Sequence, residues 1–492
     1  RYSFIGLFRP DSSRIDWLVS GMDRVRTPKW SQDGRRIAFL KFDGRKNSVA
    51  YDLGASESFA VQVVNLADRR IRTVWQSTGP ATFPYFNEST ALSWAGADRL
   101  VFYSEQDGWG RLYGIGADGG AAHPITPDGC EVAGSWFAGE DQMLVVHNCP
   151  DLDTRHVSFF NIKSGARTEL PGADAMITPP VGASGRYVAM TGSSADSPPL
   201  VRIVDLRDRK LVFAEDVAMH GFTFRFRSAA PQPVHFQSED GLTVHAELFQ
   251  PRTAGKHPAV VWFHGGPYHQ SFPAYSDLVA FSQMYAMNRA LADQGYVVLS
   301  VNYRGSTGFG RAFREDPKRA WRGASEALDA GAAARWLAAR PDVEAGHIGV
   351  WGGSYGGLMT AQSLARYSDR YKAGIALYGM YDWTFSSDNA GRWDPSRDFG
   401  AANADPALAL RSSPVGHLDT WKSPVLLFSG DDDIYVDIRH TVDLAQRLRE
   451  RGVTVDTEMI PDESHGFVLQ QSVERLWRSV SAYFAAHLGG KP

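Results

Sequence analysis

The first 228 residues alternate between short apolar runs and clusters of Gly, Asp, Ser and Pro, without sustained helical periodicity. A turn followed by an apolar strand recurs at 30–39, 93–102, 135–146 and 182–190. Each of these openings leads into a hairpin-like pair of apolar runs, as in 201–213. Units of ~40–60 residues with about four strands are typical of propeller blades, whose small sheets must stack to bury both faces.

The N-terminal stretch of residues 4–19 has the pattern of the outer half of such a blade, without its inner half. We therefore predict a partial all-β propeller over residues 1–229, with about four blades plus a fragment. Four blades are too few for this repeat, so we expect the chain to be the C-terminal part of a longer polypeptide. An upstream segment or a companion chain would then complete the propeller. The alternative is a β-sandwich of irregular strands.

Residues 230–492 have a different pattern, in which buried strands alternate with amphipathic helices. Such alternation is typical of a mostly parallel sheet covered by helices. We predict an α/β-hydrolase domain with strands at 260–263, 297–301, 348–351, 373–378, 425–428 and 455–459. The predicted helices lie at 283–294, 325–339 and 472–487.

The segment Gly352–Gly357 carries a Gly-x-Ser-x-Gly motif between a predicted strand and a predicted helix. This context turns the motif into a nucleophile elbow, a tight turn that exposes the serine hydroxyl above the sheet. We therefore predict that Ser354 is the nucleophile. The alternative is a glycine-rich turn with an incidental serine.

The acid and the base of a triad are expected after the serine, in that order. Asp431, Asp432 and Asp433 follow the strand that ends at residue 428, and the spacing favours Asp433. The alternatives are either neighbouring aspartate, or a solvated acidic turn. His465 lies in a loop of small residues before the last helix, where it would take the serine proton and return it to the leaving amine.

His264 and Gly265 follow the early strand at 260–263, the usual position of the second oxyanion donor. The first donor would be the backbone N–H of Tyr355. The alternative is a plain turn. The order of the triad argues against His264 as the catalytic base.

Several motifs together resemble the prolyl oligopeptidase family of serine peptidases: 264–267 (HGGP), 302–310 (NYRGSTGFG), 352–357 (GGSYGG) and 464–467 (SHGF). The phrase at 103–113 (YSEQDGWGRLY) resembles the dipeptidyl peptidase IV branch. The resemblance implies a propeller followed by an α/β hydrolase, with a triad of Ser354, Asp433 and His465. It also implies short peptide substrates and release of N-terminal dipeptides, often after proline or alanine.

The sequence departs from that branch at three points. It contains no Glu-Glu pair, which grips the free amine of the substrate in dipeptidyl peptidases. His264 occupies the position of that branch's oxyanion tyrosine, and Tyr435 the position of an asparagine. An acylaminoacyl peptidase, an oligopeptidase or an esterase of the same fold is therefore the alternative function. A third hypothesis, a non-catalytic propeller binding protein, conflicts with the intact triad.

The pocket for the substrate side chain is expected to be apolar and aromatic, because flat apolar walls suit proline. By position, the candidates are Tyr355, Tyr378, Tyr381, Trp383 and Val436. The alternative for each is ordinary core packing.

The composition of the chain limits the kinds of binding partner that we expect. The formal charge is −4, with 43% hydrophobic and 22% charged residues, which predicts neither a nucleic-acid nor an anionic-membrane partner. No run approaches ~18 apolar residues, so no membrane-spanning helix is expected. No metal or cofactor motif is present, and we expect neither group. Cys130 and Cys149 either pair in an oxidising compartment or remain separate thiols. The sequence leaves a homo-oligomer open, and also the choice between a periplasmic or secreted and a cytoplasmic location.

Overall fold

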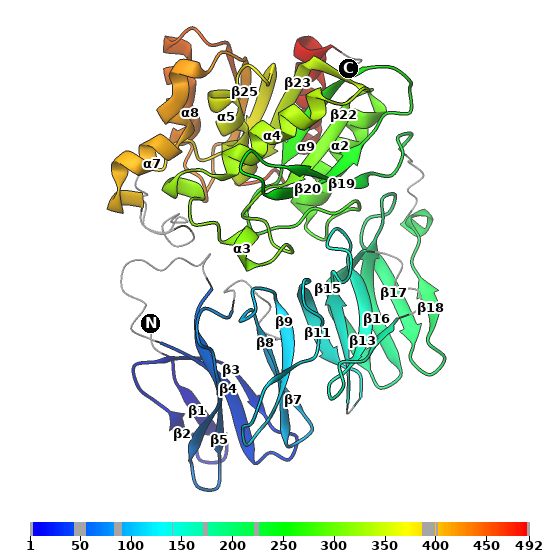
Figure 1. Ribbon diagram of the computed structural model, residues 1–492, viewed down its shortest axis with the longest axis vertical. Helices are drawn as coiled ribbons and strands as arrows, with labels where there is room; N and C mark the ends of the chain where they lie inside the picture. The colour runs from blue at the N-terminus through cyan, green and yellow to red at the C-terminus, as the bar shows by residue number, and fades with distance from the viewer. Residues whose placement is uncertain are drawn as a thin grey trace. The chain divides into compact units, whose positions relative to one another are not determined.

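A computed structural model describes residues 3–43, 56–82, 91–139, 141–170, 176–220, 226–385, 399 and 402–489, with the backbone alone at 176–184 and 220. The chain divides into two compact units (Figure 1). The first unit comprises residues 1–192, 200–215 and 308–312. The second comprises residues 193–199, 216–307 and 313–492.

The first unit consists of small sheets whose strands follow one another in chain order. A two-stranded ribbon comes first, with β1 (Ile5–Arg9) and β2 (Arg14–Val19). Among the described residues, four-stranded sheets follow it, and no sheet closes on itself. Their strands are β3 (Arg24–Trp30), β4 (Arg36–Phe42), β5 (Phe59–Asn65) and β6 (Ile71–Gln76); β7 (Leu92–Ala95), β8 (Arg99–Ser104), β9 (Arg111–Gly116) and β10 (His123–Pro124); β11 (Val132–Phe137), β12 (Gln142–His147), β13 (His156–Asn161) and β14 (Arg167–Glu169); β15 (Met176–Ser184), β16 (Tyr187–Ser193), β17 (Leu200–Asp205) and β18 (Lys210–Ala214).

Consecutive sheets of this unit share apolar cores. Alternate residues of β8 show how, because side chains of a strand point to opposite faces. Leu100 and Phe102 join a core with strands β4 and β5, whereas Val101 and Tyr103 join a core with β11, β12 and β13. The sheet of β7–β10 therefore buries both faces because it has a neighbouring sheet on each side, as the repeat pattern predicted.

A disulfide joins Cys130 and Cys149, which the sequence left open, with their Cα atoms 5.2 Å apart. The neighbouring residues reinforce this link, since the Glu131 N–H donates to the Asn148 side-chain oxygen at 2.7 Å. The Asn148 N–H donates back to the Glu131 carbonyl at 3.1 Å. This part of the first unit is thus closed both covalently and by hydrogen bonds.

The second unit is built on an eight-stranded mixed sheet with the order β19-β20-β22-β21-β23-β24-β25-β26. Pairing is antiparallel from β19 to β22 and parallel from there to β26. All six residues of β22 are buried, as expected of an inner strand covered on both faces. The strands are β19 (Gln232–Gln237), β20 (Thr243–Phe249), β21 (His257–Phe263), β22 (Val297–Asn302), β23 (Val343–Gly353), β24 (Ala373–Leu377), β25 (Val425–Gly430) and β26 (Val455–Ile460).

Helices cover both faces of this sheet (Figure 1). Helices α2 (Val279–Asp293) and α9 (Gln470–Leu488) contribute to one apolar core. Helices α4 (Glu326–Ala338), α5 (Tyr355–Arg366) and α8 (Arg439–Glu450) contribute to the other. Shorter helices lie in the connections: α3 (Arg311–Arg314), α7 (Pro406–Ser412), η2 (Val217–His220), η3 (Ala320–Arg322), η4 (Ala402–Ala404) and η5 (Pro414–Thr420).

The structure confirms the predicted strands and helices of this unit and its α/β-hydrolase fold. Helix α2 begins at Val279, earlier than the predicted residue 283, because nothing in the sequence from 279 to 282 interrupts a helix. In the first unit, the four predicted turn-and-strand openings coincide with β3–β4, β7–β8, β11–β12 and β15–β16. Within the described residues, every helix is too short or too polar to span a membrane.

Candidate active site

Ser354 lies in the turn between β23 and α5, with φ 59° and ψ −120°. A positive φ is uncommon for a residue with a side chain and marks a strained turn. The flanking glycines make the turn feasible: a Cβ on Gly352 would lie 2.6 Å from the Phe263 carbonyl oxygen, and one on Gly356 only 2.0 Å from it. The geometry is that of a nucleophile elbow, with the hydroxyl presented at the carboxyl end of the sheet.

The Ser354 hydroxyl lies within hydrogen-bond distance of His465, which is in the loop between β26 and α9. Nε2 of His465 is 2.7 Å from Ser354 Oγ, and Nδ1 is 2.8 Å from Asp433 Oδ2. Because an ionised carboxylate only accepts hydrogen bonds, Nδ1 carries the proton and Nε2 is free to accept the serine proton. The three side chains thus form a continuous hydrogen-bonded relay.

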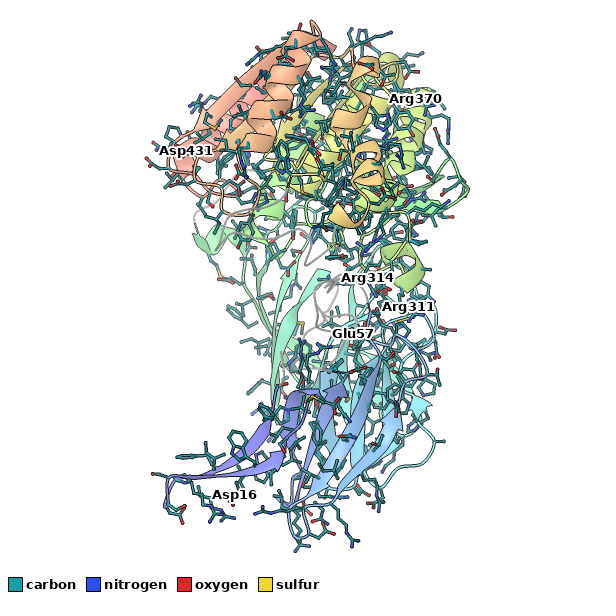
Figure 2. The ribbon with its side chains drawn as sticks, turned by 90° about the vertical axis from the view of Figure 1, so that its left-hand side faces the viewer. Asp16, Glu57, Arg311, Arg314, Arg370 and Asp431 are labelled. Atoms are coloured by element: carbon teal, nitrogen blue, oxygen red, sulfur yellow. A yellow bond between two sulfur atoms is a disulfide. The ribbon has the colours of Figure 1, made fainter. Side chains whose placement is uncertain are left out.

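Of the three candidate aspartates, the structure brings Asp433 to the histidine. It is 1% exposed, and its Oδ1 accepts the N–H groups of Tyr435 at 2.8 Å and Val436 at 2.9 Å. Asp432 is exposed, and so is Asp431, which lies at the surface of its domain (Figure 2) and accepts the Asp462 N–H at 2.8 Å.

His264 is buried and lies outside the relay. Its Nδ1 is 2.8 Å from the Gly265 carbonyl oxygen, and its Nε2 is 2.9 Å from Ser306 Oγ. The Ser306 hydroxyl in turn donates to the Tyr303 carbonyl oxygen at 2.6 Å, which ties the ring of His264 to the backbone after β22. Burial lowers the pKa of His264 to about 4, so the ring is neutral near pH 7.

The loop after His264 approaches the nucleophile through its backbone. A Cβ on Gly265 would lie 3.1 Å from the Gly353 carbonyl and 3.2 Å from Ser354 Cβ. Gly266, with φ +116°, lines the cavity beside Ser354. On the other side, Tyr355 is the first residue of α5, where an N–H has no acceptor within the helix. Two backbone segments, 265–266 and the first turn of α5, therefore lie beside the serine, at the place where an oxyanion site requires N–H donors.

A cavity of about 180 Å³ opens beside the serine and the histidine. Its walls are mainly apolar and aromatic: Gly266, Tyr355, Leu358, Met380, Tyr435 and Val436. Of the pocket residues predicted from the sequence, Tyr355 and Val436 line this cavity.

Tyr378, Tyr381 and Trp383 are not among the residues that line it. All three are buried in the apolar cores beneath the site, although the Tyr378 ring packs edge-on against His465 at 4.8 Å. The sequence reasoning missed Leu358 and Met380. Leu358 could have been found, because it lies three residues after Tyr355 and hence on the same face of α5.

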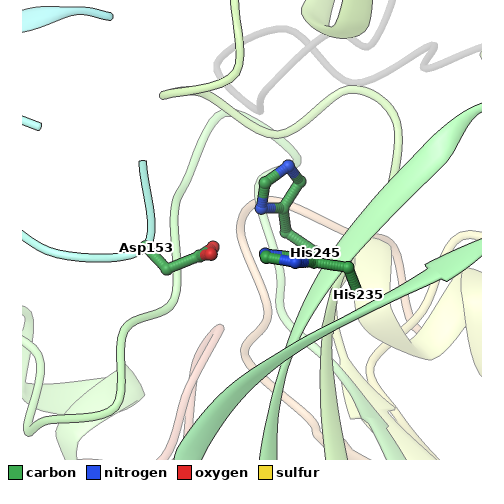
Figure 3. A group of neighbouring side chains, drawn as sticks. All are labelled: Asp153, His235 and His245. Atoms are coloured by element: carbon green, nitrogen blue, oxygen red, sulfur yellow. The ribbon is translucent and has the colours of Figure 1, made fainter. Parts of the chain in front are cut away.

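His235 on β19 and His245 on β20 stand directly opposite one another, with ring centroids 4.4 Å apart (Figure 3). Asp153, also drawn there, belongs to the other compact unit. Within the described part of their own unit, the two imidazoles form a pair, fewer than the three or four protein ligands of a zinc site. We assign no metal to them.

The mixed sheet, the elbow after β23 and the relay in the order serine, acid, histidine together define an α/β hydrolase. Residues 282–491 match the sequence model of the prolyl oligopeptidase family. The catalytic part of the chain is therefore similar to the prolyl oligopeptidase family over residues 282–491.

Two kinds of peptidase appear among its relatives. Dipeptidyl aminopeptidase BIII of Pseudoxanthomonas mexicana is 28% identical over 283 residues, which are 53% of this chain and 39% of the relative. The human acylamino-acid-releasing enzyme is 28% identical over 262 residues, 51% of this chain and 34% of the relative. Dipeptidyl-peptidase 5 of Porphyromonas gingivalis is 23% identical over 90% of this chain and 64% of its own length. The chain thus spans less than two thirds of each of these relatives.

Solved structures share the fold over nearly the whole chain. A puromycin-hydrolysing peptidase of Mycobacterium tuberculosis superimposes with a TM-score of 0.81 at 24% identity, covering 98% of this chain and 74% of the other. Dipeptidyl peptidase 4 of Porphyromonas gingivalis gives a TM-score of 0.70 at 18% identity, covering 99% and 80%. At these identities, the likeness concerns the fold.

Proposed function

We propose that this chain is a serine peptidase that hydrolyses short peptides through an acyl-enzyme. The observation that carries the proposal is the relay from Ser354 through His465 to the buried Asp433, with distances of 2.7 and 2.8 Å. Nucleophile, base and orienting carboxylate lie within hydrogen-bond reach, which is the geometry of covalent acyl transfer. The match of residues 282–491 to the prolyl oligopeptidase family supports a peptide as the substrate.

In the proposed mechanism, Ser354 Oγ attacks the peptide carbonyl carbon while Nε2 of His465 takes the hydroxyl proton. Asp433 holds the imidazole in place and stabilises its positive charge. The N–H of Tyr355 and an N–H of the Gly265–Gly266 segment stabilise the oxyanion. His465 then returns the proton to the leaving amine, and water hydrolyses the acyl-enzyme by the same steps in reverse.

For the specificity, we propose release of N-terminal dipeptides with proline, alanine or another small apolar residue before the cleaved bond. The apolar wall formed by Leu358, Met380 and Val436 supports an uncharged side chain at that position. The dipeptidyl relatives support a free N-terminus. The acylamino-acid-releasing relatives support a blocked N-terminus as the second candidate, which fits the absence of a Glu-Glu pair from this chain.

We further propose that residues 1–229 form part of a β-propeller and residues 230–492 the catalytic domain. The serial stacking of four-stranded sheets through shared cores supports the propeller. In this proposal, the sheets of this chain are about four blades and a fragment. An upstream segment or a companion chain would supply the rest.

The experiment compares cleavage of Ala-Pro-anilide with that of N-acetyl-Ala-Pro-anilide, with the Ser354→Ala variant as the blank. Preference for the free amine supports dipeptide release, and preference for the acetylated substrate supports the acylaminoacyl alternative. A panel of anilides with other apolar, polar and charged residues before the scissile bond then tests the apolar pocket. Absence of serine-dependent hydrolysis of every member would overturn the proposed function.

A further inference from the structure

Three aromatic rings form a continuous stack beside the candidate nucleophile. His264 and Tyr303 stack with centroids 4.6 Å apart and planes 24° apart, and Tyr303 and Tyr355 with centroids 5.9 Å apart and planes 6° apart. His264 begins the loop that carries Gly265, and Tyr355 directly follows Ser354. The stack therefore joins the two backbone segments that present N–H groups to the site.

Hydrogen bonds from the two tyrosine hydroxyls fix this stack. The Tyr303 hydroxyl donates to the His264 carbonyl at 2.9 Å. The Tyr355 hydroxyl donates to Oε1 of Glu326 at 2.7 Å. Glu326 begins α4 and is 1% exposed, and its oxygens also accept the Ala320 N–H at 3.0 and 3.1 Å.

A carboxyl group at this place is costly, because burial removes its hydration. Burial accordingly raises the pKa of Glu326. Replacing both members of a buried hydrogen-bonded pair by apolar side chains can be nearly neutral, so stability alone does not explain why Glu326 and the Tyr355 hydroxyl are paired here. Its bond to a tyrosine that lines the substrate cavity suggests another role.

The Tyr355 hydroxyl needs a partner, because an unpaired buried hydroxyl costs about 1–3 kcal/mol. With Glu326 as acceptor, the hydroxyl is satisfied away from the cavity and the ring presents an apolar face to it. Without this acceptor, rotation of the Tyr355 side chain toward another hydrogen-bond acceptor would lower its free energy. Such a turn would move one wall of the cavity and disturb the first residue of α5, whose N–H faces the developing oxyanion.

We propose that Glu326 is a positioning residue of the peptidase site. It holds the Tyr355 hydroxyl, and thereby fixes both the aromatic wall of the substrate pocket and the adjacent oxyanion N–H. This inference rests on the proposed peptidase function and adds a residue outside the triad that determines turnover and specificity.

The test measures kcat and KM of Glu326→Ala, Glu326→Gln, Tyr355→Phe and the double variant Glu326→Ala/Tyr355→Phe with the preferred anilide. Small misplacements at an active site reduce turnover by up to ~100-fold, so we expect Glu326→Ala to lower kcat roughly 10–100-fold with a smaller change in KM. Glutamine keeps an acceptor oxygen for the hydroxyl, so Glu326→Gln should recover most of the loss. The double variant should be no slower than about the slower single variant, because both changes break one interaction.

A matched control is Asp329→Asn. Asp329 lies on the same helix, is fully buried, and accepts hydrogen bonds from Arg304 and Ser238, away from the substrate cavity. We expect this variant to lower the melting temperature while leaving kcat and the preference for apolar side chains unchanged.

Glu326→Ala should also weaken the preference of the enzyme for apolar over polar residues before the cleaved bond.

The outcomes separate this inference from the proposed function. Wild-type hydrolysis with an unaltered kcat in Glu326→Ala would overturn the inference alone. The inference would also be overturned if the losses of kcat in the two single variants multiplied in the double variant. It would be overturned as well if Asp329→Asn lost as much turnover as Glu326→Ala. If Glu326→Ala does not fold, the test relies on the kinetics of Glu326→Gln and Tyr355→Phe. A wild-type kcat in Tyr355→Phe would then overturn the inference. Absence of hydrolysis by the wild type would overturn the proposed function and this inference with it.

Discussion

Nε2 of His465 lies 2.7 Å from Ser354 Oγ, although 111 residues separate the two along the chain. The sheet brings them together, because parallel strands β23 and β25, and the following β26, deliver their loops to the same edge. The site thus depends on the fold as a whole, while its chemistry depends on three side chains.

The first prediction concerns the relay. Ser354→Ala or His465→Ala should lower kcat by on the order of 10⁴–10⁶ with little change in substrate binding, because triad residues act as a unit. Steady-state kinetics and labelling with an active-site phosphonate measure the effect. The matched control is Ser363→Ala, since Ser363 lies on α5 and its hydroxyl donates to the Met359 carbonyl within the helix. Near-wild-type turnover in either triad variant would remove the assignment.

The second prediction separates the three aspartates. Asp433→Asn should lower kcat by about 10⁴, because an amide holds the histidine in the wrong tautomer. Asp431→Asn and Asp432→Asn should retain activity within about threefold, since both side chains are exposed and changes at exposed sites usually have small effects. A larger loss in either of these two variants than in Asp433→Asn would reassign the acid.

Much of the catalytic unit could be predicted because its signals are local. The elbow around Ser354 needs glycines at fixed positions, and the structure shows the backbone atoms that a Cβ would strike. The order of serine, acid and histidine follows from the order of strands in this fold. The spacing favours Asp433 over its neighbours, and Asp433 is the aspartate that the structure brings to His465.

The pocket was less predictable, because its walls come from side chains whose direction depends on the tertiary fold. Tyr378, Tyr381 and Trp383 follow β24 in sequence, yet all three are buried in the core. The flexible Met380 between them lines the cavity instead. Glu326 gave no signal in the sequence, since a glutamate at the start of a helix usually stabilises the helix dipole.

The third prediction concerns the elbow glycines. Gly356→Ala would place a Cβ 2.0 Å from the Phe263 carbonyl oxygen, which the backbone of β21 cannot avoid. We expect a loss of at least about 1–3 kcal/mol in unfolding free energy, together with loss of activity. Gly346→Ala on β23 is the matched control, because its Cβ would meet nothing within 4 Å. Equal stability of the two variants, measured by chemical denaturation, would contradict the close contact.

The fourth prediction concerns pH and the buried His264. Its pKa is lowered from 6.5 to about 4, so between these pH values the unfolded chain binds more protons than the folded one. This contribution to stability is therefore fully present above about pH 6.5 and is lost as the pH falls. Between pH 8 and pH 5 we expect the wild type to lose about 2 kcal/mol through this group. Chemical denaturation at both pH values should show a smaller loss in His264→Asn, and equal losses in both proteins would contradict a neutral buried ring.

The fifth prediction concerns the disulfide between Cys130 and Cys149, which are 19 residues apart in sequence. A cross-link of this span restricts the unfolded chain, and we expect its removal in Cys130→Ser/Cys149→Ser to cost about 3 kcal/mol. The hydrogen bonds between Glu131 and Asn148 persist without it, so hydrogen exchange should show a less stable first unit with its strands still paired. A reducing agent should lower the melting temperature of the wild type and leave that of the double-serine variant unchanged. No effect of the reductant on the wild type would show that the bond adds nothing to stability, since the same loop would then be held by hydrogen bonds and packing alone.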